Sequence, residues 1–230
     1  MFHPTLLRNP IVRKLLMAFS GLLLAGFIVA HLLGNLTVFL GPDGINAYAH
    51  HLQQLGPLLW VFRGGLLAAA GMHVGFGLLL TLENRRARPK AYYRSKPQRS
   101  TLAGRTMIYS GLCLAAFAGF HLLHFTLRLL GPEITPWLDD LQRPDVFSML
   151  VIHFRLAGFV LVYILGMGAL YFHLSHGLGS MLQTFGLNNA RTLPWFGLLS
   201  SLIAALLAAG FAAIPALIFF GFITVQGGAA

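Results

Sequence analysis

The sequence predicts an all-α integral membrane protein with five transmembrane helices, and three observations support this: the composition, the long apolar segments and the placement of charge. Of the 230 residues, 57% are hydrophobic and only 10% are charged. The mean hydropathy is +0.73. A soluble domain needs a more polar surface than this composition supplies. We therefore expect the whole chain, 1–230, to form a single transmembrane domain.

Five apolar segments, each long enough to cross a hydrocarbon layer of about 30 Å, justify the five helices. They are expected at approximately 14–39, 57–82, 104–130, 147–181 and 192–225. The fourth is longer than a crossing requires, so we expect it to project beyond the membrane. The aromatic residues and Pro215 of the fifth indicate lipid-facing packing beside a core made by the first four. The first segment is too long for the core of a cleavable secretion signal.

Basic residues gather on one side of the predicted membrane. The link between the second and third segments holds eight of the sixteen Lys and Arg residues against one acid, Glu83. The positive-inside rule then puts the N-terminus in the cytoplasm and the C-terminus outside, in the cell inner (cytoplasmic) membrane. The basic link at 84–105 is a candidate docking surface for acidic lipid or a partner subunit, with a purely topological role as the alternative. We expect no nucleic-acid partner, because the charges flank membrane spans.

An ungapped internal similarity relates the first two helices to the next two. SGLLLAGFIVAHLL (20–33) aligns with SGLCLAAFAGFHLL (110–123) at the Ser-Gly pair, the phenylalanine, the histidine and the final leucines. HVGFGL (73–78) aligns with HLSHGL (173–178) at the histidine and the Gly-Leu pair. These matches predict a parallel duplication within the first four helices.

Helix geometry places four histidines of these matched segments in two pairs. With a rise of 1.5 Å per residue, His31 and His121 both lie roughly 16 Å beyond their Ser-Gly pairs, toward the outer face. His73 lies roughly 22 Å in from the outer surface, and the repeat places His173 at the same depth. Two imidazoles at matched depth on different helices are what an axially ligated haem iron needs. We therefore predict a di-haem four-helix bundle with an internal pseudo-repeat.

Other interpretations stay open from the residues alone. A single membrane histidine is more often hydrogen-bonded to a neighbouring helix than bound to a metal. The glycines near the histidines, Gly26, Gly71, Gly75 and Gly119 among them, suit a flat macrocycle or close helix packing. No acid lies well inside the first four segments, which disfavours an ion transporter. Cys113 is the only cysteine, so no intrachain disulfide is expected.

The chain resembles the cytochrome b membrane-anchor subunit of succinate dehydrogenase and fumarate reductase, in its single-polypeptide, five-helix, di-haem form. The resemblance is carried by AHLLGN (30–35), NAYAHHLQQLGPLLWVFRGG (46–65), MHVGFG (72–77), FHLLHFT (120–126) and FHLSHGLGSMLQTFG (172–186). It implies that His31 and His121 ligate the iron of a distal haem b. It also implies that His73 and His173 ligate the iron of a proximal haem b, nearer the cytoplasm.

The resemblance implies an electron-transfer subunit of succinate:quinone oxidoreductase, respiratory complex II. Electrons would pass through two b haems between an iron–sulfur subunit and a membrane quinone, often menaquinone, in either direction. The iron–sulfur clusters and FAD would belong to partner subunits on the cytoplasmic side, and this chain would hold no dicarboxylate site. Two alternatives remain: a haem b subunit that links a hydrogenase or formate dehydrogenase to quinone, and a haem-free transporter or anchor.

Further candidate residues surround the predicted ligands. Candidate contacts of the haem propionates or haem edges are Arg63, Arg155, Ser20, Ser110, His176 and Ser180. Candidates for an outer quinone site are Asn46, Tyr48, His50, His51 and His124, with His153 at the same end. For each of them, surface snorkelling or a structural hydrogen bond is the alternative. Some relatives carry a glutamate two residues before the proximal ligand; Tyr171 stands here, so the resemblance implies no glutamate-based proton path.

Overall fold

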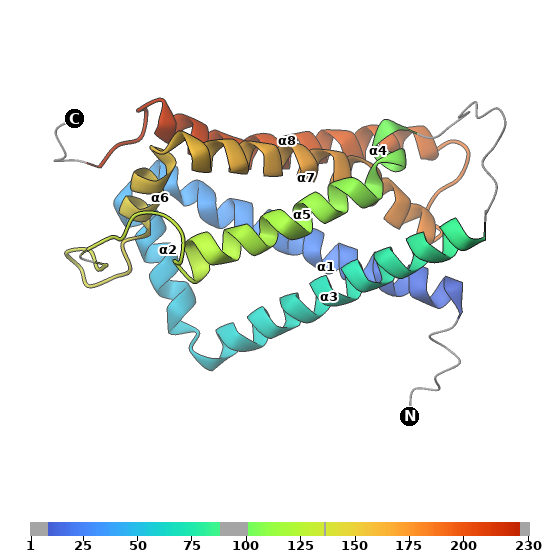
Figure 1. Ribbon diagram of the computed structural model, residues 1–230, viewed down its shortest axis with the longest axis horizontal. Helices are drawn as coiled ribbons and strands as arrows, with labels where there is room; N and C mark the ends of the chain where they lie inside the picture. The colour runs from blue at the N-terminus through green and yellow to red at the C-terminus, as the bar shows by residue number, and fades with distance from the viewer. Residues whose placement is uncertain (1–8, 88–100, 136, 226–230) are drawn as a thin grey trace.

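The computed structural model describes residues 9–87, 101–135 and 137–225, and these form helices and loops with no β-strand (Figure 1). The α-helices are α1 (Pro10–Leu36), α2 (Pro42–Gln54), α3 (Pro57–Arg86), α4 (Leu102–Arg105), α5 (Met107–His121), α6 (Val146–Phe154), α7 (Ala157–Thr184) and α8 (Leu193–Phe219). A 3₁₀ turn, Thr37–Leu40, extends α1, and a π-helical turn, Leu122–Thr126, extends α5.

Five helices are long and apolar enough to cross a membrane, which confirms the predicted number. They are α1 with its 3₁₀ turn, α3, α5 with its π turn, α7 and α8. Proline stands at the start of α1, α3 and α8, where its missing N–H has no partner to lose and its fixed φ favours the helix. The short α2 lies between the first two spans and crosses the end of the molecule in Figure 1.

The fourth predicted segment is two helices rather than one. α6 ends at Phe154, and α7 begins at Ala157 after Leu156 adopts an extended backbone with φ −90° and ψ 111°. The residues on both sides of Arg155 are mostly apolar and no proline marks the break, so the hydropathy pattern predicts one continuous segment. The N-terminus of α6 is fixed by the Asp145 carboxylate, which accepts a hydrogen bond from the Ser148 N–H at 3.0 Å.

The long helices pack as two antiparallel pairs. α3 lies mainly against α1, α5 lies mainly against α7, and α8 covers α7 (Figure 1). The expectation that Pro215 faces lipid is wrong, because Pro215 and Ile218 are buried where α8 flanks the other helices. A Cβ on Gly210 would lie 2.9 Å from Leu32 of α1, so a small residue permits this close approach.

An ion pair ties the first helix pair together near its ends. The Arg13 side chain of α1 contacts the Glu83 carboxylate of α3, the one acid of the basic link. Most of that predicted docking surface, residues 88–100, lies outside the described residues.

Candidate functional site

The four predicted ligand histidines meet in two pairs, and each pair joins one helix of the first antiparallel pair to one helix of the second. The ring centroids of His31 on α1 and His121 at the end of α5 lie 5.7 Å apart, with an interplanar angle of 80°. Those of His73 on α3 and His173 on α7 lie 6.0 Å apart, at 74°.

The spacing of each pair fits two imidazoles on opposite sides of one metal ion. With a nitrogen–metal bond of about 2 Å on each side, the two ring centroids fall about 6 Å apart. Within the described part of the chain there is no group of three or more His, Cys, Asp or Glu side chains that could hold a metal ion. Two histidines alone suit an iron whose other four ligands come from a macrocycle. The donor set therefore fits haem.

The His73 ring is held by the backbone of α1. Its Nδ1 lies 3.1 Å from the Met17 carbonyl oxygen, which can only accept, so Nδ1 carries the proton and Nε2 keeps a free lone pair. A Cβ on Gly21 would lie 3.0 Å from His73 Cε1, so the ring sits directly against that glycine. Backbone partners of this kind fix the tautomer and the orientation of a metal-ligating imidazole.

The His173 ring is held in the same manner by α5. A backbone hydrogen bond joins it to Met107, and the Ser110 hydroxyl lies 3.4 Å from its Nδ1. A Cβ on Gly111 would lie 3.1 Å from His173 Cε1.

The second pair has different neighbours. Phe27 stacks on His31 with centroids 5.2 Å apart, and the Asn35 amide nitrogen lies 3.3 and 3.4 Å from its two ring nitrogens. On the other side, His121 Nδ1 lies 3.1 Å from the hydroxyl of Tyr163, a buried residue of α7. On α1, Gly21 contacts His73 of one pair and His31 belongs to the other. These two residues are ten positions apart, so roughly 15 Å of helix separates the two pairs.

Sequence reasoning missed Tyr163, although a usable signal was present. α5 and α7 run antiparallel with Ser110 beside His173. Eleven residues forward from Ser110 is His121, and ten residues back from His173 is Tyr163. Equal rises along the two helices therefore bring the hydroxyl and the imidazole to one depth.

The glycines near the histidines divide into two classes. A Cβ would meet no heavy atom within 4 Å at Gly26, Gly71, Gly75 and Gly119. These four therefore are not used for close helix packing within the described chain. At Gly34, by contrast, a Cβ would overlap the ring of Tyr48, so that glycine serves the packing of α2 on α1.

The two candidate propionate-binding arginines lie at the surface. Arg63 is exposed and lies over the Trp60 ring, 4.9 Å from its centroid, where both border an open depression of about 520 Å³. Arg155 is exposed at the break between α6 and α7. Neither makes an ion pair with a described residue, and the structure does not bring either to the paired rings.

The candidate serines and His176 have local partners. Ser20 is fully buried and donates to carbonyls of the preceding turn of α1, and Ser110 likewise donates to the Met107 carbonyl at 3.0 Å. Ser180 lines a depression of about 270 Å³ with Lys14, between α1 and α7. The His176 ring packs on α4, where a Cβ on Gly104 would come within 2.9 Å of it.

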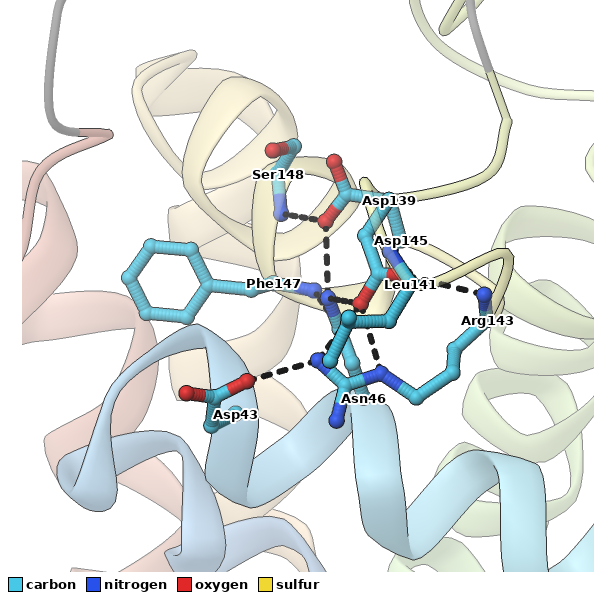
Figure 2. Close-up of polar contacts among 8 residues, drawn as sticks. All are labelled: Asp43, Asn46, Asp139, Leu141, Arg143, Asp145, Phe147 and Ser148. Carbon is cyan, nitrogen blue, oxygen red and sulfur yellow. Dashed lines mark hydrogen bonds and ion pairs between the residues drawn. The ribbon is translucent and has the colours of Figure 1, made fainter.

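Asn46, a predicted quinone contact, is fully engaged by the loop before α6 (Figure 2). Its amide nitrogen donates to Asp139 and Asp145, both at 3.2 Å, and its oxygen accepts from the Phe147 N–H at 2.9 Å. The side chain is 0% exposed. These contacts account for Asn46 as the residue that attaches the loop to α2.

Arg143 completes this polar cluster. Its guanidinium donates to Asp43 of α2 at 2.7 Å and to Asp139 at 2.8 Å (Figure 2). Burial opposes ionisation of Asp139, but hydrogen bonds from Arg143 and Asn46 outweigh it and hold the pKa of that carboxyl below its usual range. The hydrogen bonds of Arg143 to Asp139 and Asp43 raise the pKa of its guanidinium.

The remaining quinone candidates are divided between two places. His50 and His51 lie on α2, 3.0 and 3.4 Å from the Gln54 side chain. His124 is buried, and its contacts are with the region around His121. The structure therefore does not gather the five predicted quinone residues around one cavity.

The arrangement available for chemistry is thus two opposed imidazole pairs within the spans, at two levels, beneath an end formed by α2, α6 and the loop before α6. Comparison with protein-family models, with curated protein sequences and with solved structures returned no match for this chain.

Proposed function

We propose that this chain is the di-haem membrane-anchor subunit of a succinate:quinone oxidoreductase, the class that includes succinate dehydrogenase and fumarate reductase. In this role it binds two b haems and passes electrons between an iron–sulfur subunit and a membrane quinone, often menaquinone. The iron–sulfur subunit and its flavoprotein partner lie on the cytoplasmic side in this proposal, where the positive-inside rule puts the N-terminus.

One observation carries the proposal: two pairs of opposed imidazoles, with centroids 5.7 and 6.0 Å apart, stand at two levels of one helix assembly. Hydrogen bonds to neighbouring helices would satisfy each membrane histidine separately, and they do not by themselves require the rings to meet in pairs. Two matched spacings of about 6 Å instead suit axial ligation twice over.

The duplication inferred from the sequence gains support from the contacts of the inner pair. Met17 and Gly21 stand to His73 as Met107 and Gly111 stand to His173. Each methionine backbone meets one ring, and each glycine lets that ring lie against the helix. We propose that the first four helices form the two halves of a pseudo-symmetric bundle.

In this proposal, the residues of the chain act by holding ligands in place. His73 donates its Nδ1 proton to the Met17 carbonyl and presents Nε2 toward His173. His31 and His121 present their rings to each other one level away. Bound haem supplies reversible one-electron transfer, while the protein sets its depth, its ligand geometry and its access to water. The level of His31 and His121 lies toward α2, where His50 and His51 remain candidates for a quinone contact.

The test is a reduced-minus-oxidised spectrum of the native complex, with haem quantified as pyridine haemochrome. We expect two b haems per chain in the native protein, and one haem in each of His31→Ala and His73→Ala. His51→Ala is the matched control, because this exposed histidine of α2 lies outside both pairs, and it should retain both haems.

Two results contradict the proposal: no haem in the native protein, or a single haem that both substitutions leave in place. The absence of haem would favour a haem-free anchor or transporter. A separate measurement distinguishes the partner enzyme. Co-purification with a flavoprotein that oxidises succinate supports the proposed complex, whereas co-purification with a hydrogenase or formate dehydrogenase contradicts it.

A further inference from the structure

A chain of hydrogen bonds leads from His121 to the loop that precedes α6. His121 Nδ1 lies 3.1 Å from the Tyr163 hydroxyl, which lies 3.0 Å from His124 Nδ1. His124 Nε2 lies 2.6 Å from His153 Nδ1, and His153 Nε2 lies 2.9 Å from the Pro132 carbonyl oxygen. The chain thus crosses from α5 to α7 and to α6, and ends on a loop outside the spans.

The last acceptor fixes the direction of every bond in this chain. A carbonyl oxygen can only accept, so His153 Nε2 carries a proton and donates it to Pro132. A neutral His153 then has only a lone pair at Nδ1, which accepts from His124 Nε2–H. His124 Nδ1 in turn accepts from the Tyr163 O–H, and the Tyr163 oxygen accepts from His121 Nδ1–H. His121 is left with its free lone pair on Nε2.

The neutral forms that this argument requires follow from the surroundings. His124 is 0% exposed and His153 is 2% exposed. None of their hydrogen-bond partners is a carboxylate, and two charged imidazoles 2.6 Å apart would repel each other. Burial also lowers the pKa of His153, which its hydrogen bond to the Pro132 carbonyl offsets only in part.

We propose that Tyr163, His124 and His153 are positioning residues that fix the tautomer and ring orientation of His121, with the Pro132 carbonyl as their anchor. The inference rests on the proposed function, because it assigns the free Nε2 of His121 to a haem iron shared with His31. The His73 ring needs no such chain, since the Met17 carbonyl holds it directly.

The packing around the chain keeps its members in place. The His124 ring stacks on Phe159 with centroids 4.2 Å apart and on Phe125 at 4.0 Å, so it has little freedom to turn. The π-helical turn that starts directly after His121 changes the direction of the next side chains.

A glycine permits the anchor to reach its partner. Gly131 has φ +96°, a conformation that favours glycine, and a Cβ there would lie 2.8 Å from His153 Cε1. A side chain at this position would therefore displace either the Pro132 carbonyl or the His153 ring.

This hydrogen-bond chain should change the midpoint potential of one proposed haem and leave that of the other unchanged. A hydrogen bond from Nδ1–H raises the basicity of an axial imidazole and so favours the ferric iron that it ligates. Removal of the acceptor should raise the midpoint potential of the haem at His31 and His121. The haem at His73 and His173 should keep its potential, because its contacts are to α1 and α5 backbone.

Potentiometric titration of the complete complex tests this with four variants. Tyr163→Phe removes the acceptor and should raise the potential of one haem. His153→Phe lets His124 change its tautomer and donate to the Tyr163 oxygen, which then accepts less strongly from His121. This variant should therefore raise the potential of the haem at His31 and His121 by less than Tyr163→Phe does. His153→Gln keeps one acceptor and one donor and should restore the native value. Tyr171→Phe is the matched control on α7, because the Tyr171 hydroxyl makes no hydrogen bond to a described residue, and it should change neither potential.

The outcomes separate this inference from the proposed function. The shifted haem is identified as the one that is missing in His31→Ala. Three results would contradict the proposed hydrogen-bond chain: native potentials in both Tyr163→Phe and His153→Phe, equal shifts of both haems, or a shift in Tyr163→Phe alone. If two haems are still bound in these variants, the proposed function stands. A native complex without haem would overturn both.

Discussion

The contact between Gly21 and His73 gives a quantitative test of the inner pair. A Cβ added in Gly21→Ala would lie 3.0 Å from His73 Cε1, whereas two carbon atoms ordinarily approach to about 3.5 Å. The ring must therefore move by a few tenths of an ångström. It cannot simply turn away, because its Nδ1 is bonded to the Met17 carbonyl.

The required movement exceeds what a metal bond accepts. Ligand distances in well-formed sites stay within about 0.2 Å of their ideal values. Displacement of an orienting contact typically weakens metal binding by roughly ten- to hundred-fold. We expect Gly21→Ala to weaken the binding of the haem between His73 and His173 by that factor, and Gly111→Ala to act on the same haem through His173.

The assay is competitive transfer of haem to an excess of apomyoglobin, followed spectroscopically in detergent. Gly64→Ala on α3 is the control, because a Cβ there meets no heavy atom within 4 Å, and nine residues of helix turn it to the side opposite His73. Native retention of both haems in Gly21→Ala would refute the reasoning. So would selective loss of the haem at His31 and His121.

Three further predictions concern the end of the molecule around α2. Asn46→Ala leaves the buried Phe147 N–H without its acceptor and should destabilise the protein by about 1–3 kcal/mol, seen as a lower Tm in detergent. The pKa of Asp139 is depressed in the folded state. Its contribution to the free energy of unfolding is therefore fully present above about pH 4 and is lost as the pH falls below that value. Asp139→Asn should therefore flatten the acid side of a plot of Tm against pH, and an unchanged acid side would contradict the Arg143 contacts. Gly34→Ala forces a methyl group into the Tyr48 ring and should cost about 1–3 kcal/mol by thermal unfolding, whereas a native Tm would show that α2 can shift freely.

Much of the fold was predictable because hydropathy reports membrane spans directly. Five spans were expected and five are present; their ends differ by at most six residues, except that the fourth span begins at Ala157 rather than at 147. The break at Leu156 was not predicted, since no proline marks it and Arg155 is compatible with the outer end of one continuous helix. The position depends instead on where α6 meets α2, a contact between segments a hundred residues apart.

The candidate site shows the same division between local and distant information. The pairing of His31 with His121 followed from a repeat and from helix rise, and the structure places those rings together. The partners of Asn46 stand 93 to 101 residues away in the chain, so no local pattern distinguished a quinone contact from a structural amide. Arg63 and Arg155 were predicted from depth alone, and depth does not report which face of a helix a side chain occupies.

The two histidine pairs differ in a way that bears on how the proposed halves of the bundle diverged. At the inner level, His73 and His173 have matching supports, each a methionine backbone and a glycine of the facing helix. At the other level the supports do not match, because His31 has Asn35 on its own helix and His121 has Tyr163 on another.

A backbone carbonyl is present whatever the side chain, so supports of the first kind persist through substitution. Side-chain partners can be exchanged one at a time, and each exchange changes the basicity of one ligand. If the proposed haems are bound, the level beside α2 and α6 is therefore where single substitutions should alter the properties of one haem without disturbing the other. On this argument, a change at Tyr163 separates the two potentials more readily than any change at Met17 or Met107.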